Sequence, residues 1–593
     1  MLETCLESDF SPGTNLENDL AGADWRFLMP SLEMRRIVSL GMPSPSTLTV
    51  LSKGSTDLSV VVRDGSELER AQFLSKSFPE WNLTVIGRSE NQSLPFQART
   101  IDLVFIERLE SIEGLARDDF LIADLNRVLN SNGVIYFEHS RLAGHRLKRS
   151  LLRHLRQEGL GAVQSYWLTP FHGPMRTAGP VGDERIGHFF FSKVLTGRSL
   201  LNRVLSRIGR CLSRMGVLQH ILPRRAGLIR RSLMPDERKR PPEYLVTLAA
   251  DHGIDLEDHR FGVSARGKCN SNKIIFFFFT RRGCADVVAK VTRSPCFNYR
   301  LEHEHRVLSL LVHKGFVKEG TLPTPLFLGY HAGRAIAVQK AIEGDPFRAR
   351  TRATSSCPIA RAGISWITQL GASSARESQR EAMGTALQRL YHGFNGIYRL
   401  DMRQRAFLEG QLERLTRREV RLPTVVQHGD PGTHNILVSP SGDVIFLDWE
   451  SSELKGMPLW DLFYFLRAYG SWARRIKGHG DALDNFVRHF LLGSPLTLLF
   501  SEAIRDYCQR IGVRQSLVEP LFYSCWMHRA LKEVAMLAPS SVQDGRYVSL
   551  LRLILEPRNR ARLAALVFPH PSRAAVWCEA SPWQPADDSV AGA

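Results

Sequence analysis

The sequence lacks the features that mark secreted, membrane-spanning and disulfide-bonded proteins. Its nine cysteines, scattered from Cys5 to Cys578, form no C-x-x-C pair and no cysteine–histidine spacing of a zinc site. This pattern favours reduced thiols. Residues 1–18 carry acids but no basic or apolar signal region. The longest apolar runs, such as 274–279, are strand-length and far short of a bilayer span. We therefore expect a cytoplasmic protein.

The charge is one-sided, at a formal +18 for 593 residues. Such an excess is compatible with nucleic acid, an anionic membrane or an acidic small substrate. Much of it is local, because between 198 and 240 basic residues crowd a segment whose only acids are Asp236 and Glu237. The excess is thus weak evidence for a nucleic-acid enzyme, and we expect no nucleic-acid partner.

The length predicts two to four domains. Residues 1–46 are interpreted as an N-terminal extension and 570–593 as a disordered tail. In 47–198, runs such as TLTVLSKG, DLSVVVRDG and IDLVFIE alternate with helical stretches, which predicts a parallel sheet with helices on its faces. AVQSYWLTP and RIGHFFFSKV are expected to close that sheet as an antiparallel pair.

Residues 199–242 are predicted to form a basic amphipathic linker. Arg203, Arg207, Arg210 and Arg214 recur at helical spacing, with apolar residues largely on the other side. One interpretation is a linker helix packed on a domain with its arginine face in water, and we favour it. The other is peripheral contact with an anionic membrane or a partner through 199–232.

The strongest chemical signal is the segment VVQHGDPGTHNILVSPSGDVIFLDWE, residues 425–450. Phosphoryl transfer needs a carboxylate that takes the proton of the acceptor hydroxyl, and oxygen ligands that hold Mg²⁺. Here Asp430 is the candidate base, while Asn435 and Asp448 are candidate metal ligands at the two ends of a predicted β-hairpin. Glu450 is a further candidate ligand, and His428 is expected to brace the loop.

HGDPGTHNIL followed by FLDWE resembles the aminoglycoside phosphotransferase and choline kinase family. The resemblance implies a bilobal kinase-like fold over 243–569, with a small lobe at about 243–345 and a helical lobe at about 346–569. The predicted fold class is therefore α/β followed by α+β. PLWDLFYFL resembles the family's next helix, which implies that Asp461 supports the catalytic loop.

The same resemblance implies the nucleotide-binding residues. Lys290, at the end of VVAK, takes the place of the strand lysine that holds the ATP phosphates, and Glu304 that of its helix partner. The loop 266–273 lacks a G-x-G-x-x-G pattern. Its candidate phosphate-facing residues are Gly267, Asn270 and Ser271. The adenine is expected against the backbone from Lys340 to Ile342.

Residues 47–198 resemble the class I methyltransferases that use S-adenosylmethionine. The elements that carry this likeness include Leu94, Pro95, Phe96, Asp102, Arg127, Leu129 and Gly133. The glycine-rich turn that such a cofactor needs fails in our alignment, because VVVRDGSEL sets Arg63 and Glu67 where small residues belong. We therefore interpret this domain as degenerate and do not expect S-adenosylmethionine as a cofactor.

The expected function is ATP- and Mg²⁺-dependent phosphorylation of a small-molecule hydroxyl, on an aminoglycoside, a sugar or an amino alcohol. Two alternatives stay open from the sequence. One is a nucleotide-sensing scaffold with a non-catalytic kinase fold, against which the intact Asp430, Asn435 and Asp448 argue. The other is a bifunctional methyltransferase and kinase.

Overall fold

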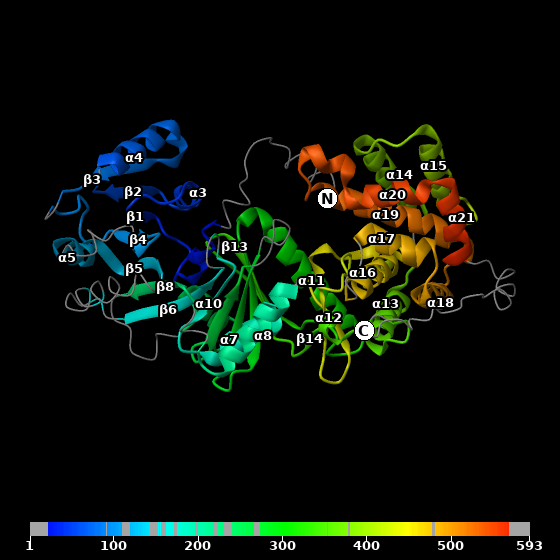
Figure 1. Ribbon diagram of the computed structural model, residues 1–593, viewed down its shortest axis with the longest axis horizontal. Coiled ribbons are helices and arrows are strands. Elements are labelled where there is room, and N and C mark those ends of the chain that lie inside the picture. The colour runs from blue at the N-terminus through cyan, green and yellow to red at the C-terminus, as the bar shows by residue number, and fades with distance from the viewer. Residues whose placement is uncertain are drawn as a thin grey trace, which may run out of the picture. The chain divides into compact units, whose positions relative to one another are not determined.

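The computed structural model describes residues 22–568, except 64, 90–91, 110–118, 141–151, 153–154, 156–159, 161, 171–172, 174, 196–199, 218–221, 231–239, 266–272, 353, 378–379 and 477–480. Contacts divide the chain into two compact units. The first, here the sheet unit, comprises 1–305 and 325–342; the second, the helical unit, comprises 306–324 and 343–593. Figure 1 labels many of their helices and strands. The tail 570–593 lies outside the described residues.

The sheet unit is built on one mixed sheet of thirteen strands, in the order β12-β13-β11-β10-β9-β7-β6-β8-β5-β4-β1-β2-β3. Its strands are β1 Arg36–Leu40, β2 Asp57–Val62, β3 Leu83–Gly87, β4 Ile101–Ile106, β5 Leu129–Ser140, β6 Ala162–Thr169, β7 Thr177–Pro180, β8 Arg224–Arg230, β9 Arg260–Ser264, β10 Lys273–Phe279, β11 Ala285–Thr292, β12 Pro325–His331 and β13 Arg334–Lys340. Its helices are η1 Asp24–Leu28, α3 Pro45–Gly54, α4 Gly65–Ser77, η2 Pro79–Trp81, α5 Asp119–Val128, α7 Glu184–Phe189, η5 Phe190–Val194, α8 Leu200–Arg214, α10 Glu243–Asp251, η7 Pro295–Phe297 and the start of α11 Asn298–Lys314.

The predicted parallel sheet is confirmed for β3, β2, β1, β4 and β5, which pair in parallel. The expected α/β class is therefore correct for this part of the chain. The first strand, however, is β1 at Arg36–Leu40, within the predicted extension. TLTVLSKG, expected as a strand, is helix α3, because Pro45 begins that helix and proline is favoured in a first turn.

Two further expectations about this sheet are wrong. RIGHFFFSKV is helical, in α7 and η5, because Asp183 caps the helix by accepting a hydrogen bond from the Ile186 N–H. Residues 199–242 are more than a linker, since they contain β8, which pairs antiparallel with both β5 and β6. Its buried stretch, Ala226–Ile229, is hidden in the sequence by the arginines that flank it.

The two halves of the large sheet are joined at β7 and β9, which pair antiparallel. The N-terminal η1 strengthens this join from one side. Asp24 and Arg293, the residue that follows β11, form a buried ion pair at 2.9 Å. Trp25 stacks on Phe105 and Tyr136, with ring centroids 4.5 and 4.6 Å apart. The segment predicted as an extension is thus part of the sheet unit's core.

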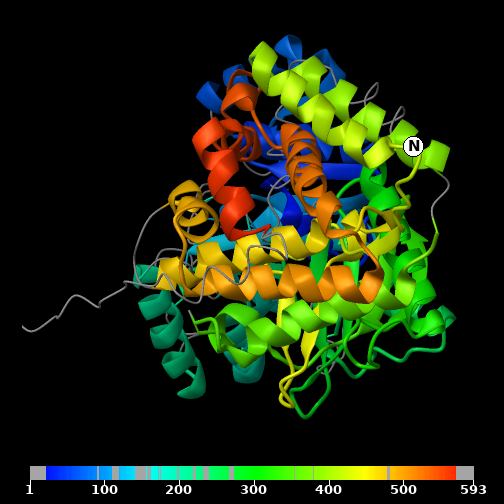
Figure 2. The same ribbon diagram turned by 90° about the vertical axis from the view of Figure 1, so that its right-hand side faces the viewer.

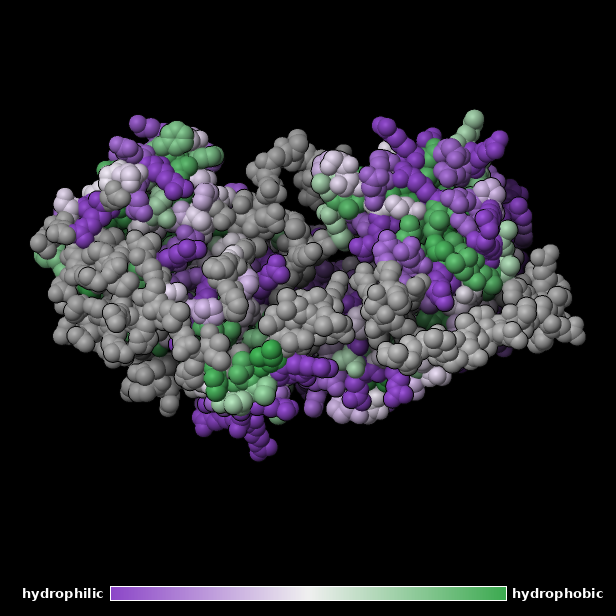
Figure 3. All heavy atoms as spheres, viewed as in Figure 1, coloured by the Kyte–Doolittle hydropathy of each residue, from purple (hydrophilic) through white to green (hydrophobic). Residues whose placement is uncertain are grey.

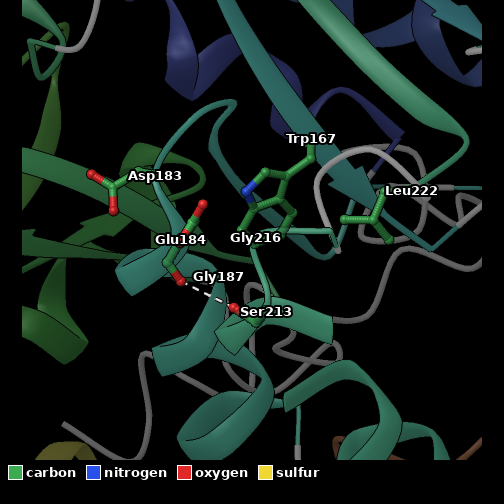
Figure 4. A pocket seen from close by; sticks show the side chains of 7 residues that line it. All are labelled: Trp167, Asp183, Glu184, Gly187, Ser213, Gly216 and Leu222. Carbon is green, nitrogen blue, oxygen red and sulfur yellow. Dashed lines mark hydrogen bonds between the residues drawn. The ribbon is translucent and has the colours of Figure 1, made fainter. Parts of the chain in front are cut away.

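Helix α8 packs on α7 and η5, as the favoured interpretation of the linker predicts. Ser213 Oγ donates to the Glu184 carbonyl at 3.0 Å, and a cavity of about 10 Å³ lies beside this contact (Figure 4). A space of that size holds about one water molecule. Ile208 and Met215 stay 48 and 66% exposed, and hydrophobic and hydrophilic side chains adjoin at α7 and α8 in Figure 3. Membrane or partner contact through 199–232 stays a prediction.

The helical unit has one large hydrophobic core. Helices α13, α16 and α18 lie side by side in it (Figure 2). Its elements are the end of α11, β14 Asp345–Pro346, α12 Phe347–Arg350, α13 Pro358–Ser374, α14 Arg380–Ile397, α15 Met402–Thr416, β15 Val425–Gln427, β16 Ile436–Val438, β17 Val444–Phe446, η8 Trp449–Ser451, β18 Glu453–Gly456, α16 Trp460–Ile476, α17 Ala482–Phe486, η9 Val487–Leu491, α18 Pro495–Ile511, η10 Gln515–Leu517, α19 Val518–Val534, η11 Pro539–Asp544, α20 Arg546–Leu555 and α21 Pro557–Leu566. This is the mainly helical composition predicted for about 346–569.

None of the helices in the described part of the chain combines the length and the apolar character needed to cross a membrane.

Candidate active site

The strand lysine and helix glutamate predicted from the sequence are in contact. Lys290 on β11 and Glu304 on α11 form an ion pair with Nζ 2.5 Å from Oε1, and their side chains are 7 and 2% exposed. The neighbouring acid Glu302 points elsewhere and accepts a hydrogen bond from Tyr330 at the surface. Burial leaves this lysine few alternatives, so the pair is held rather than transient.

The structure describes only some of the other residues that are predicted to bind the nucleotide. Gly267, Asn270 and Ser271 lie outside the described residues. Lys340 is the exposed last residue of β13 and Ile342 is half-buried. Contact of the adenine with the backbone from Lys340 to Ile342 stays a prediction.

The candidate catalytic loop, residues 428–435, lies wholly within the helical unit and follows the buried strand β15. Gly429 has φ 79°, and a Cβ at this position would clash with the Ser451 carbonyl oxygen. Glycine is therefore required for steric reasons as well as for its positive φ. Any residue with a side chain, such as the arginine in the H-R-D motif of protein kinases, would clash at this position.

Asp461, at the start of α16, fixes the beginning of that loop. Its carboxylate accepts the backbone N–H of His428 at 2.5 Å and that of Gly429 at 3.1 Å. Burial raises the pKa of Asp461 from its ordinary value of 3.8 to about 6, against the lowering effect of these two hydrogen bonds. The supporting contact predicted for this residue is present.

Asp430 is oriented by two neighbours and remains accessible. Asn435 Nδ2 donates to its carbonyl oxygen at 3.0 Å and to Oδ2 at 3.2 Å, and Arg529 Nη2 lies 3.3 Å from Oδ1. The Asp430 side chain is still 30% exposed. Because Nδ2 faces Asp430, Asn435 Oδ1 is left without a partner among the described residues and is available to a cation.

The hairpin β16–β17 brings the second predicted metal ligand close to the first. Ile436 pairs with Phe446, and the Leu447 N–H donates to the Asn435 carbonyl at 2.7 Å. Asp448 follows at once, in the left-handed region with φ 68°. Such a conformation is uncommon for a residue other than glycine and occurs often at functional sites. Glu450 is half-buried in η8.

His428 links the loop to this hairpin. Its ring lies 2.8 Å from the Leu447 carbonyl through Nε2, and the Asp430 N–H donates to Nδ1 at 3.2 Å. Both contacts are satisfied when Nε2 carries the proton. The residue is 1% exposed, which fits the bracing role predicted for it rather than contact with a substrate.

Sequence reasoning missed the cations on α19. Arg529 donates through Nη1 to the Gly429 carbonyl, besides its contact with Asp430. Glu453, the first residue of β18, is paired with Lys532 at 3.2 Å and with His528 at 3.4 Å. Burial alone would raise the pKa of Glu453. The hydrogen bonds and positive charges of His528 and Lys532 outweigh that effect and hold the pKa below its ordinary value. A signal existed, because His528, Arg529 and Lys532 interrupt an otherwise apolar helix.

Within the helical unit, an oriented carboxylate lies near two residues whose side-chain oxygens are of the kind that binds a cation. Comparison with known proteins agrees, since residues 271–492 match the model of the phosphotransferase enzyme family. The C-terminal half of the chain therefore carries a domain of this family. No curated protein is a significant match to the chain.

Several solved structures are similar at low identity. Aminoglycoside-3′-phosphotransferase of type VIII is 18% identical over 49% of this chain and 98% of its own, with a TM-score of 0.30. A S-adenosylmethionine-dependent methyltransferase from Aquifex aeolicus is 16% identical over 22% of this chain and 68% of its own, with a TM-score of 0.18. WbdD, in a co-crystal with the kinase inhibitor LY294002, is 13% identical over 84% of this chain and 87% of its own, with a TM-score of 0.22. These likenesses are weak, so the assignment of a phosphotransferase domain rests on the family match over residues 271–492.

Proposed function

We propose that this protein is a kinase that transfers the γ-phosphate of ATP to a hydroxyl group of a small molecule. The single observation that supports it best is Asp430, a carboxylate fixed by Asn435 and Arg529 yet 30% exposed. The chain thus orients this carboxylate and still leaves it accessible to another molecule.

In this proposal Asp430 accepts the proton of the acceptor hydroxyl while the acceptor oxygen bonds to the γ-phosphorus. The bond between that phosphorus and the oxygen of ADP breaks in the same displacement. Proton transfer by a positioned side chain contributes about 10²- to 10⁴-fold to a rate. Lys290, held by Glu304 at 2.5 Å, supplies the positive charge for the ATP phosphates.

The residues present fit a magnesium ion. Asn435 Oδ1 has no partner among the described residues, and Asp448 follows the strand beside it. Mg²⁺ in kinases takes one or two protein ligands and completes its octahedron with phosphate oxygens and water, which agrees with the lack of any larger cluster of His, Cys, Asp and Glu among the described residues. When bound, the ion neutralises charge on the transferring phosphoryl group.

The experiment is ATP consumption with Mg²⁺ by the purified full-length protein across pools of sugars, amino alcohols and aminoglycosides. We expect turnover that depends on one pool, and Asp430→Asn is expected to lower it by at least about 10³-fold. Asp443→Asn, on the surface turn of the same hairpin, is the matched control and is expected to keep full activity. ATP binding without turnover on any pool would favour the nucleotide-sensing scaffold instead.

A further inference from the structure

The surroundings of Asp430 contain more hydrogen-bond donors than the chain satisfies. Arg467 on α16 is 5% exposed, and its Nε is buried with no hydrogen-bond partner among the described residues. Arg529 Nε is buried and unpaired in the same way. Trp526, stacked near Tyr547 at 6.0 Å, adds a third such N–H. Buried polar groups are ordinarily paired, so several orphaned donors in one place indicate a missing acceptor.

These donors converge on one aromatic ring. The guanidinium carbon of Arg467 lies 4.9 Å from the ring centroid of Tyr547, and that of Arg529 lies 5.7 Å from the same centroid. Arg529 also lies 3.7 Å over Tyr464. Cation–π contacts orient the two guanidinium groups but do not satisfy their Nε–H groups. The Nε donor of each arginine therefore has no hydrogen-bond partner among the described residues, while both Nη groups of Arg529 are engaged by Gly429 and Asp430.

When the buried positive and negative side chains around Asp430 are paired, one positively charged side chain has no acidic partner in the described part of the chain. Arg529 faces Asp430 at 3.3 Å, and Lys532 faces Glu453 at 3.2 Å. Asp461 is engaged by two backbone N–H groups. Arg467 has no acidic partner among the described residues, although a buried charge without a partner costs several kcal/mol. Proteins keep such a charge when a ligand completes the pair.

The position of Arg467 also suits an acceptor. Tyr464 and Arg467 stand three residues apart on α16, about 4.5 Å along the helix axis. Tyr464 is packed against Arg529, which contacts Asp430. Arg529 thus links the two positions, since it contacts Asp430 and lies over the Tyr547 ring that Arg467 also faces.

We propose that Arg467 and Arg529 form an anion-binding subsite beside Asp430, and that the acceptor is a hydroxyl compound carrying a phosphate or carboxylate group. This inference rests on the proposed kinase function and narrows its acceptor class. A polycationic aminoglycoside is disfavoured, because two guanidinium groups would repel it and because Glu453 is already neutralised by Lys532.

The test uses matched acceptors with the full-length protein: glucose, glucose 6-phosphate, galacturonate and glucosamine. ATP consumption is expected to favour the two anionic compounds by at least about tenfold. Arg467→Gln is expected to raise KM for the better anionic acceptor by about 10- to 100-fold, because one buried charge partner is lost. The dissociation constant of Mg-ATP should stay unchanged, and Arg467→Lys should restore part of the KM. Arg510→Gln, a surface variant on α18, is the matched control.

Two outcomes separate the failure of this inference from failure of the kinase proposal. Turnover that depends on Asp430 but is confined to glucose or glucosamine would overturn the anion subsite and leave the kinase standing. Turnover on no acceptor would count against the kinase. The subsite is then judged by thermal unfolding with inorganic phosphate, which should stabilise the wild type and the Arg510→Gln variant more than Arg467→Gln. Equal stabilisation of all three would overturn it.

Discussion

Two loops that follow buried strands differ in how they use their polar groups. After β1, the start of α3 is occupied by the chain itself: Glu107 accepts the Ser44 N–H and hydroxyl, both at 2.7 Å, and the Thr47 hydroxyl at 3.1 Å. After β15, the polar groups fix Asp430 but leave its side chain 30% exposed. The first loop satisfies its donors internally, whereas the second leaves a carboxylate accessible to another molecule.

The comparison indicates what distinguishes the candidate site: its polar side chains are held in position by the chain, yet some of their hydrogen-bonding atoms have no partner in the part of the chain that the structure describes. A helix N-terminus attracts anions through its free N–H groups and its dipole. In α3 the anion is already present as Glu107. In the catalytic loop Asn435 keeps a free Oδ1, and Arg529 and Arg467 keep free donors among the described residues.

The largest effect that would sharpen this contrast is expected at Asp448. Asp448→Asn keeps a side chain that tolerates the left-handed backbone but removes the charge that would bind Mg²⁺. We expect turnover to fall by about 10²- to 10³-fold, since metal stabilisation of several kcal/mol corresponds to that factor. The Mg²⁺ concentration for half-maximal rate should rise, while the melting temperature stays within about 2 °C.

The Mg²⁺ titration of this variant needs a control on the same hairpin, and Asp443→Asn provides it because Asp443 pairs with Lys318 at the surface. Equal Mg²⁺ requirements in the wild type and Asp448→Asn would remove Asp448 from the metal site.

An intermediate effect is expected from Asp461, through pH. Its folded pKa of about 6 lies above the ordinary value of 3.8, so the folded protein binds the proton more tightly than the unfolded chain. The contribution of Asp461 to the free energy of unfolding is thus full below about pH 4 and is lost as the pH rises through about 6. Activity should change in the opposite direction, because a protonated Asp461 is a poorer acceptor for the His428 and Gly429 N–H groups.

The pH–rate profile of the wild type should therefore fall below about pH 6. Asp461→Asn should lower kcat by about tenfold at pH 8, as expected for one lost hydrogen bond, and should remove the contribution of Asp461 to the acid limb. Asp506→Asn, on the surface of α18, is expected to keep the wild-type profile. An acid limb that is the same in wild type and Asp461→Asn would show that Asp461 does not control the loop.

Only part of the fold and of the candidate site could be predicted from the sequence. The local geometry of the candidate catalytic loop was predictable, because its spacing is local: one short hairpin brings Asn435 and Asp448 close together. The first strand of the sheet was not, since Arg36–Leu40 is only five residues long and precedes a β-branched run that Pro45 turns into a helix.

Contacts distant in the sequence were the hardest to predict. Arg529 reaches Asp430 across 99 residues, and Asp24 reaches Arg293 across 269. No spacing rule connects such pairs, because the packing of whole helices and strands brings them together. The alignment that set Arg63 and Glu67 at the glycine turn was wrong for a related reason, as it was shifted by one strand from the loop after β1.

The smallest effect is expected at the loop after β1. A different result there would contradict the contrast drawn between the two loops. Wild type should show no saturable binding of S-adenosylmethionine up to millimolar concentration in a calorimetric titration. Glu107→Gln should lower the free energy of unfolding by about 1 to 2 kcal/mol, because three donors lose a charged acceptor. Glu69→Gln, exposed on α4, should leave it unchanged. Micromolar affinity for S-adenosylmethionine would favour the bifunctional alternative.

The most direct test of the central claim is to measure Mg-ATP affinity and phosphoryl transfer together, in the wild type and in Asp430→Asn. A braced base predicts nearly equal dissociation constants for Mg-ATP in the two proteins and a loss of transfer to the preferred acceptor of at least about 10³-fold in the variant. Transfer that persists at the wild-type rate in Asp430→Asn would contradict the assignment of this residue and with it the proposed mechanism.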